Sequence, residues 1–196
     1  MSKEILVVGI GSLILGLIVA PLVLPALPDG WGGPMMYRDA TPVGAAGRID
    51  AHFIEQMIPH HEGAIAMAGI ALERSRRPEI LSLANGIIEA QERENRDMRA
   101  WYQEWFGSAP IARHGMGMMH MGGMEGDTEA LRRVSDAEFD REFMLQMIPH
   151  HEMAIVMARM LQASTEREEM KMLADAIITS QSREILMMQS WLESWY

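Results

Sequence analysis

Two adjacent histidines follow a proline in the motif Met-Ile-Pro-His-His, which the sequence contains twice, at residues 57–61 and 147–151. In a helix, Met57 and His61 are four residues apart, so their thioether and imidazole groups project to the same side. A proline inside a helix removes one backbone hydrogen bond, a cost that a helix built only for packing would avoid. Thioethers select Cu(I), and imidazole also suits copper. The motif therefore predicts a soft-metal site.

The helices expected around each motif add further candidates. Met98 shares a helical face with Gln91 and Glu94. Four buried imidazoles are costly without partners, and either a metal ion or the carboxylates of Glu94 and Glu184 would satisfy them. The candidate metal ligands are Met57, His60, His61, Met67, Met98, Met147, His150, His151, Met157 and Met188. The residues expected to orient the imidazoles are Gln91, Glu94, Gln181 and Glu184.

Core packing is the alternative interpretation of these residues. A lone buried histidine is usually a core residue with satisfied hydrogen bonds, and methionine fills irregular gaps in cores. Here, however, the histidines are adjacent, lie on an apolar face beside methionine and occur twice. This pattern favours a metal site over core packing. His52 has no counterpart, because Glu142 stands at the matching position, so we expect it at the surface. Glu62 and Glu152 point further round the helix, and we expect them in solvent.

A glycine-rich segment between the two motifs, RHGMGMMHMGGMEGD, carries a second set of candidate ligands. Glycine-rich sequence cannot bury methionine as a helix face would, so core packing does not explain these residues. Short tracts rich in His and Met trap soft metals, and the same chemistry would hold Ag(I). The alternatives without metal are an oxidant sink through reversible sulfoxide formation and an inert linker. The candidate ligands here are His114, Met116, Met118, Met119, His120, Met121 and Met124.

These candidates belong to an internal repeat. Residues 50–105 recur at 140–195 with a constant offset of 90 and no insertion. Each copy has two stretches with apolar residues at helical spacing, and no stretch alternates with period two, so we expect no strands. Two hairpins of equal length, each with one apolar face, most simply close into an antiparallel four-helix bundle. The sequence therefore predicts an all-α fold.

Local sequence also predicts where the helices begin and end. The turn of the first copy is expected near Ser75–Pro78, with Pro78 at the first helical position. The second copy has two candidate capping boxes, at residues 135–138 and 165–168. We expect the four tryptophans of the repeat to close the end of the bundle by packing; they are Trp101, Trp105, Trp191 and Trp195.

Composition excludes several classes of function. The 196 residues include 20 methionines and no cysteine, so disulfides, cysteine–zinc sites, iron–sulfur clusters and thiol nucleophiles are all absent. A formal net charge of −10 leaves no basic field that would attract nucleic acid. In an exported protein, a thioether is a soft ligand that cannot be lost to a disulfide.

An uncharged apolar block at residues 5–27 indicates export. A helix of this length would span about 34 Å, enough to cross a bilayer. Lys3 precedes the block, which favours a cytoplasmic N-terminus with the remainder in the periplasm or at the cell exterior. We expect a retained membrane anchor, although Pro21 and Pro25 break the far end of the helix. A cleaved signal peptide is the alternative.

The chain thus divides into five expected segments. They are a membrane anchor or signal segment at 1–27, a Gly/Pro-rich linker at 28–48, a helical hairpin at 49–106, a Met/His/Gly-rich loop at 107–134 and a second hairpin at 135–196. The expected partners are a metal ion and, through residues 5–27, the membrane. A protein that accepts copper would be a further partner, and the oligomeric state is left open.

Catalytic patterns are missing from the motifs. A ferritin-like di-iron or di-manganese site needs Glu-x-x-His, but Met57 and Met147 stand three residues before His60 and His150. A zinc hydrolase needs H-E-x-x-H, and no second histidine follows Glu62 at that spacing. We therefore expect a binding protein and no enzyme. The alternatives are a ferritin-like metal-dependent oxidoreductase and a structural or interaction bundle without metal.

The repeated pattern resembles a known family. It reads F-x-x-x-MIPHH-x-x-AI-x-MA, then LA-x-x-II-x-x-Q-x-x-E, and ends in a methionine and a tryptophan. This is similar to the domain-of-unknown-function 305 family of bacterial exported or membrane-anchored proteins. The resemblance implies a ferritin-like helical bundle and, from some members, copper binding and copper tolerance in the periplasm. The family has no general reaction, and this chain departs from its pattern at Gly63 and Met153.

Together these observations predict an anchored, extracytoplasmic helical bundle that binds Cu(I) or Ag(I) through methionine and histidine. Such a protein would sequester the ion or hand it on without turnover. Whether the two motifs share one site or make two stays open at this point.

Overall fold

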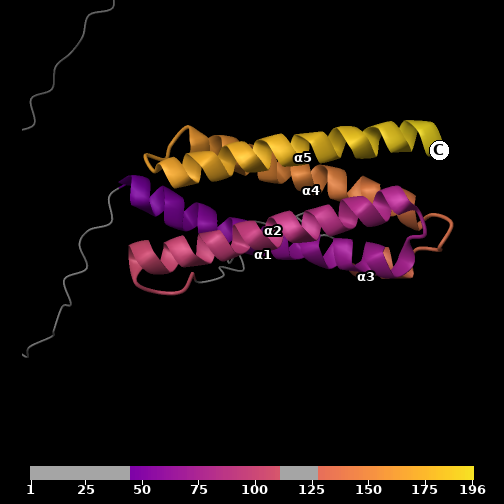
Figure 1. Ribbon diagram of the computed structural model, residues 1–196, viewed down its shortest axis with the longest axis horizontal. Helices are drawn as coiled ribbons and strands as arrows, with labels where there is room; N and C mark the ends of the chain where they lie inside the picture. The colour runs from indigo at the N-terminus through magenta and orange to yellow at the C-terminus, as the bar shows by residue number, and fades with distance from the viewer. Residues whose placement is uncertain (1–44, 111–127) are drawn as a thin grey trace, which may run out of the picture. The chain divides into compact units, whose positions relative to one another are not determined.

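The computed structural model describes residues 45–110 and 128–196, and these residues form five helices and no strand (Figure 1). The all-α prediction is therefore confirmed for the described residues. The helices are α1 (Ala45–Arg74), α2 (Pro78–Phe106), α3 (Thr128–Arg133), α4 (Phe139–Gln162) and α5 (Glu168–Trp195).

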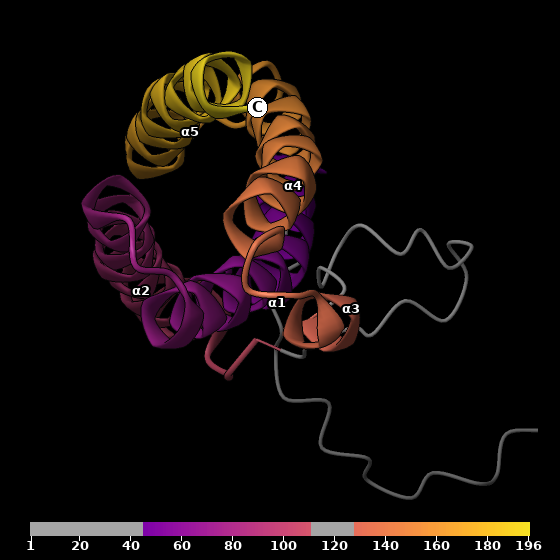
Figure 2. The ribbon, with the colours of Figure 1, turned by 90° about the vertical axis from the view of Figure 1, so that its right-hand side faces the viewer.

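The two halves of the repeat form two helical hairpins that pack through their first helices. α1 packs against α2, α4 packs against α5, and α1 packs against α4. Around the bundle the helices follow one another as α5, α4, α1 and α2, and α2 and α5 do not pack along each other's length (Figure 2). The four long helices thus surround a common interior, as a bundle requires, but the α2–α5 side is more open than the prediction assumed.

The core consists of two apolar clusters, one on each side of the histidines. One cluster joins Phe139 and Phe143 to the end of α1 and the start of α2. The other joins Phe53 and Ile54 to the end of α2, the end of α4 and the start of α5. Because the histidine motifs fall between these clusters along both α1 and α4, the imidazoles form a polar layer inside an apolar core.

The hairpin turns lie where the sequence predicts them, but the capping boxes are wrong. α1 ends at Arg74 and α2 begins at Pro78, as expected. The cap residues of α4 and α5 are Glu138 and Arg167, and neither makes a side-chain cap hydrogen bond. The hydroxyl of Thr165 instead accepts a hydrogen bond from the backbone N–H of Arg167 at 3.2 Å, inside the turn before α5 begins.

The short helix α3 is a feature that the sequence did not predict. Leu131 of α3 is fully buried in the cluster that contains Phe139. The guanidinium of Arg74, at the end of α1, donates hydrogen bonds to the backbone carbonyls of Leu131 and Val134 at 3.1 and 2.7 Å. It also bonds the carboxylate of Asp136 at 2.6 Å. One arginine therefore fastens α3 to the first hairpin.

The turn of each hairpin reaches across to the other hairpin through an arginine. In the turn before α2, Nε of Arg77 lies 3.2 Å from Oδ2 of Asp140 in α4. The guanidinium carbon of Arg77 lies 4.3 Å from the ring centre of Trp195, at the end of α5. An arginine over a tryptophan ring is attracted by the ring's negative face. This contact therefore joins the first hairpin to both ends of the second.

The second copy of the repeat makes the same contact in return. Nε of Arg167 lies 3.2 Å from Oδ2 of Asp50, and its guanidinium carbon lies 4.0 Å from the ring centre of Trp105. Each clamping tryptophan also stacks on the tryptophan four residues before it, Trp101 or Trp191. We call these two sets of contacts the reciprocal clamps. One consists of Arg77, Asp140 and Trp195, and the other of Arg167, Asp50 and Trp105. The tryptophans therefore do more than the end packing that the sequence predicts.

The predicted anchor, linker and loop lie mostly outside the residues that the structure describes. α1 begins at Ala45, inside the segment expected to be a linker. Among the residues that the structure describes, no helix is long and apolar enough to cross a membrane. The expected anchor at residues 5–27 lies outside the described residues, as does most of the Met/His-rich loop.

Candidate metal centre

His60 and His150 each follow the proline inside their helix, and the packing of α1 against α4 brings the two side chains together. Their ring centroids lie 3.8 Å apart, with the ring planes tilted by 42°. Only 1% of His60 and 2% of His150 is exposed. The two copies of the motif therefore meet at His60 and His150, which is the arrangement that a site shared by both copies would require.

The second histidine of each pair is held by a carboxylate from the partner helix of its own hairpin. Nε2 of His61 lies 2.7 Å from Oε2 of Glu94, and Nε2 of His151 lies 2.6 Å from Oε2 of Glu184. The sequence left two partners open for the imidazoles, a metal ion or these carboxylates, and the structure shows the carboxylate pairing for His61 and His151. A carboxylate accepts only from a protonated nitrogen, so in the neutral form of each imidazole this bond leaves the lone pair on the opposite ring nitrogen, Nδ1.

The Nδ1 atoms of His61 and His151 are buried and have no hydrogen-bond partner among the described residues. A carboxylate that fixes one ring nitrogen while the other carries a free lone pair is the usual arrangement of a metal-binding histidine. The geometry of each Glu–His pair is therefore compatible with metal ligation at Nδ1.

His60 is neutral in this environment. Burial, followed by the neighbouring His150 and the other two histidines, lowers the pKa of His60 far below its ordinary value. Neither of its ring nitrogens has a hydrogen-bond partner among the described residues. A neutral imidazole carries a lone pair on one of its two ring nitrogens, and this is the form that binds metals. The centre thus offers lone pairs where a purely structural core would satisfy them.

Buried methionines belong to the apolar clusters on both sides of this layer of histidines. Met57 and Met98 are fully buried in the cluster on one side of the layer. Met67, Met147 and Met188 are fully buried in the cluster on the other side. Four further methionines outside the predicted ligand set divide between core and surface. Met144 and Met170 are fully buried, whereas Met160 and Met172 are largely exposed.

Some predicted residues are placed less favourably for a site at this centre. Met157 is only half-buried, at the edge of the cluster that contains Met57. Gln91 and Gln181 are buried, but their side-chain oxygens accept no hydrogen bond in the described part of the chain. The structure therefore shows the orienting contact for Glu94 and Glu184 alone, and the candidate ligands at residues 114–124 lie outside what it describes.

Carboxylates and histidines alone do not make a metal site in this arrangement. Within residues 45–110 and 128–196, no three side chains of His, Asp or Glu converge in the geometry of a metal site. A metal ion at the centre would therefore need the neighbouring thioethers as additional ligands. That requirement favours a soft ion over a hard one.

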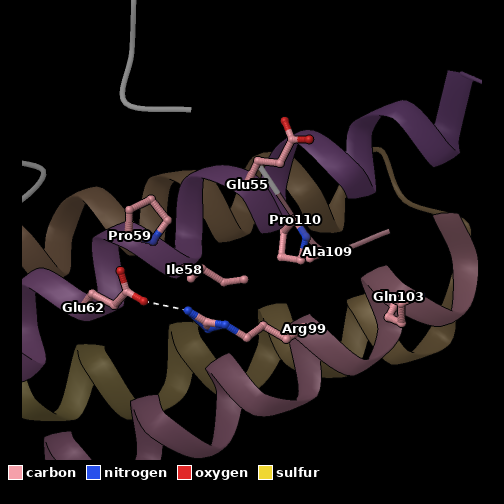
Figure 3. Close-up of a pocket in the computed structure, with 8 residues that line it drawn as sticks. All are labelled: Glu55, Ile58, Pro59, Glu62, Arg99, Gln103, Ala109 and Pro110. Atoms are coloured by element: carbon pink, nitrogen blue, oxygen red, sulfur yellow. Dashed lines mark hydrogen bonds and ion pairs between the residues drawn. The ribbon is translucent and has the colours of Figure 1, made fainter. Parts of the chain in front are cut away.

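A small pocket lies beside Pro59, lined by residues of the first copy of the repeat and by Ala109 and Pro110 after it. Figure 3 shows Glu62 and Arg99 facing each other across it, and they form an ion pair at 2.6 Å. Glu55, also at the pocket, accepts a hydrogen bond from the hydroxyl of Tyr102 at 2.6 Å. His52 and Glu62 are exposed, as predicted. The sequence did not predict the buried Glu55–Tyr102 contact, because Leu145 and Leu192 replace both residues in the second copy.

The chain is similar to solved structures of CopM. CopM in its Cu(II)-bound form is 48% identical over 75% of this chain and 97% of CopM, with a TM-score of 0.70. CopM in its Cu(I)-bound form is 46% identical with the same coverage and a TM-score of 0.67. A silver-bound form, obtained by soaking, is 46% identical over 75% of this chain and 96% of CopM, with a TM-score of 0.66.

The same fold occurs in a DUF305 fragment from Deinococcus radiodurans, which is 29% identical over 74% of this chain and 96% of the fragment, with a TM-score of 0.67. No curated protein matches the chain. The family model described as "Domain of unknown function (DUF305)" matches residues 50–192, which include both copies of the repeat and both histidine pairs. The chain therefore belongs to the DUF305 family.

Proposed function

We propose that this protein binds Cu(I) or Ag(I) through methionine and histidine, and that it acts by holding the ion or passing it on. The observation that carries the proposal is the contact between two buried rings, those of the neutral His60 and of His150, whose centroids lie 3.8 Å apart. Both rings lie between clusters that contain buried thioethers. Imidazole and thioether together are ligands for a soft monovalent ion.

The donor set favours binding over redox catalysis. Di-iron and di-manganese centres need several inward carboxylates. The carboxylates nearest the histidines here, Glu94 and Glu184, are already bonded to His61 and His151. Binding alone lowers the concentration of the free ion and needs no turnover, so the proposed role has no catalytic residue.

The comparison with CopM supports the choice of ion. CopM has been crystallised in Cu(I)-, Cu(II)- and silver-bound forms, and it aligns with three quarters of this chain. The proposed location is extracytoplasmic. It is supported by the apolar block at residues 5–27 and by a ligand set without cysteine. In this location the protein would sequester copper or supply it to an acceptor protein.

The test is an anaerobic competition titration of the whole chain with Cu(I) against a coloured Cu(I) chelator. We expect affinity well tighter than micromolar. The double variant Met57→Leu/Met147→Leu should lose at least about tenfold in affinity, since leucine keeps the volume and removes the sulfur. The matched control is Met160→Leu/Met172→Leu, which removes two exposed sulfurs and should bind as the unaltered chain does.

The same titration decides between this proposal and its alternatives. Affinity no tighter than micromolar would contradict soft-metal binding. The remaining interpretation would then be a structural or interaction bundle without metal. Tight binding that survives replacement of all four motif histidines by alanine would place the site outside the centre, in the segment at 114–124. The number of equivalents bound then tells whether the two motifs share one ion.

A further inference from the structure

A groove of about 520 Å³ lies between the start of α2 and the end of α5, at the end of the bundle that faces the viewer in Figure 2. It runs along the side on which α2 and α5 do not pack against each other. Its lining includes Glu184, Met187 and Trp191 of α5 and Glu79 of α2. The groove therefore opens next to a residue that already belongs to the candidate metal centre.

Glu184 connects this groove to the buried histidines. Its side chain is 15% exposed, and its Oε2 lies 2.6 Å from Nε2 of His151, whose side chain is fully buried. A single carboxylate therefore reaches from the groove to a histidine of the central layer.

Met187 places a sulfur in the same groove. It follows Glu184 by three residues and precedes Trp191 by four, so the three side chains share one face of α5. Met187 is 36% exposed, unlike the fully buried methionines of the centre. A thioether beside an aromatic ring suits a soft cation, because the ring face adds electrostatic attraction.

The charges of the groove also favour a cation. Glu79 and Glu184 contribute carboxylates, and none of its lining residues in the described part of the chain is basic. The pocket beside Pro59 differs in both respects: its Glu62 is paired with Arg99, and no sulfur lines it. The groove is therefore the better of these two paths for a soft cation.

We propose that this groove is the route by which the soft monovalent cation enters the centre, with Met187 as the first ligand and Glu184 as the link to His151. The inference rests on the proposed function. Each step exchanges one metal–ligand bond for another: Met187 replaces a ligand of the incoming ion, and the buried ligands replace Met187. No electron is transferred. The carboxylate of Glu184 balances the positive charge as the ion leaves water.

The test measures the rate of uptake separately from affinity. Cu(I) is presented as its coloured chelator complex under anaerobic conditions, and the loss of colour is followed by stopped flow. All chains carry leucine at the five loop methionines and alanine at the two loop histidines, so that uptake reports on the centre; these positions are Met116, Met118, Met119, Met121, Met124, His114 and His120. We expect Met187→Leu to load at least threefold more slowly, with unchanged stoichiometry and affinity.

Two control variants make the result specific. Met160→Leu removes a sulfur that is more exposed than Met187 but lies on α4, away from the groove. Asp97→Leu alters the position that corresponds to Met187 in the first copy of the repeat. Both should load at the rate of the parent chain. An unchanged rate in Met187→Leu, or an equal slowing in Met160→Leu, would overturn the route while leaving the proposed function intact. No uptake by the parent chain, with its loop altered, would overturn the route. No uptake by the unaltered chain would overturn the proposed function as well.

Discussion

His60 and His150 occupy the same place in the two copies of the repeat, and their rings meet with centroids 3.8 Å apart in the middle of the core. Neither copy could build this contact alone, since each contributes one ring. The packing of α1 against α4 is what brings the rings together. The duplication therefore has a direct structural consequence: it assembles a centre that a single hairpin lacks.

Acid should destabilise the metal-free protein through His60. Burial lowers the pKa of His60 far below its ordinary value of 6.5, which the unfolded chain retains. Below pH 6.5 the unfolded state therefore binds a proton that the folded state does not, and the free energy of unfolding falls as the pH falls. The loss approaches about 1.4 kcal/mol per pH unit for one such group. Urea unfolding of the metal-free chain at a series of pH values from neutral to mildly acidic measures it.

A pair of variants assigns this pH dependence to His60. His60→Gln removes the titrating group. The free energy of unfolding of this variant should therefore fall less steeply on acidification, with a slope that corresponds to about one proton fewer. His52→Gln alters an exposed histidine and should follow the unaltered chain. Equal slopes in all three proteins would show that His60 does not carry the effect.

Glu184, whose carboxylate holds His151, should matter more for Cu(I) affinity than for the stability of the fold. Glu184→Gln keeps an oxygen that can accept the hydrogen bond from Nε2 of His151, so the free energy of unfolding should change by less than about 1 kcal/mol. Cu(I) affinity should fall by about tenfold or more, because an orienting carboxylate raises the basicity of its histidine. Chelator competition and urea unfolding measure the two quantities.

Alanine at the same position provides the contrast. Glu184→Ala leaves the buried N–H of His151 without a partner, which should cost about 1–3 kcal/mol of stability. Glu152→Gln, at an exposed position after the second histidine pair, should change neither quantity. If Glu184→Gln binds Cu(I) as tightly as the unaltered chain, the carboxylate serves the fold alone.

The sequence predicts the helices well because their signals are local and repeated. Apolar spacing marks the long helices, and Pro78 marks the start of α2. α3 has only six residues, too few for a periodic pattern, and its place depends on the distant Arg74. The capping box at 165–168 is wrong because Thr165 bonds within the turn instead. A local pattern cannot tell which of two nearby N–H groups a hydroxyl will bond.

The candidate centre can be predicted in part, because its motif is also local and repeated. Two identical motifs on matching faces imply that His60 and His150 could meet, and the spacing of Glu94 within its helix makes it a partner for His61. The reciprocal clamps and Met187 were missed because each depends on a residue from the other hairpin lying nearby. Such contacts become visible only when the packing of the two hairpins is known.

The reciprocal clamps should contribute a measurable coupling between the hairpins. A double-mutant cycle of Arg77→Met and Trp195→Leu should give a coupling of about 0.5–1 kcal/mol in the free energy of unfolding. Arg77 is partly exposed, so its ion pair with Asp140 adds little in solvent. The exposed Glu92–Arg96 pair is the control, for which we expect about 0.3–0.5 kcal/mol. A clamp coupling near zero would mean that the stacked arginine is held by the fold and contributes nothing to it.

The prolines of the two motifs should reduce stability while supporting metal binding. Pro59 and Pro149 lie inside α1 and α4, where proline has no N–H for the carbonyl four residues earlier. Alanine restores that hydrogen bond, so Pro59→Ala/Pro149→Ala should raise the free energy of unfolding by about 1–3 kcal/mol, as urea unfolding would measure.

Cu(I) affinity of the same double variant should move in the opposite direction. A proline usually kinks its helix, so replacing both residues shifts the turns that carry His60 and His150 and should lower the affinity at least fivefold. The control is Pro78→Ala, because Pro78 occupies the first position of α2, where its missing N–H would have no helical partner. It should alter stability little and affinity not at all. Loss of stability in Pro59→Ala/Pro149→Ala would contradict the prediction, since the prolines would then serve packing. A gain in stability with reduced affinity would show that both helices are less stable than they could be because the centre requires their shape.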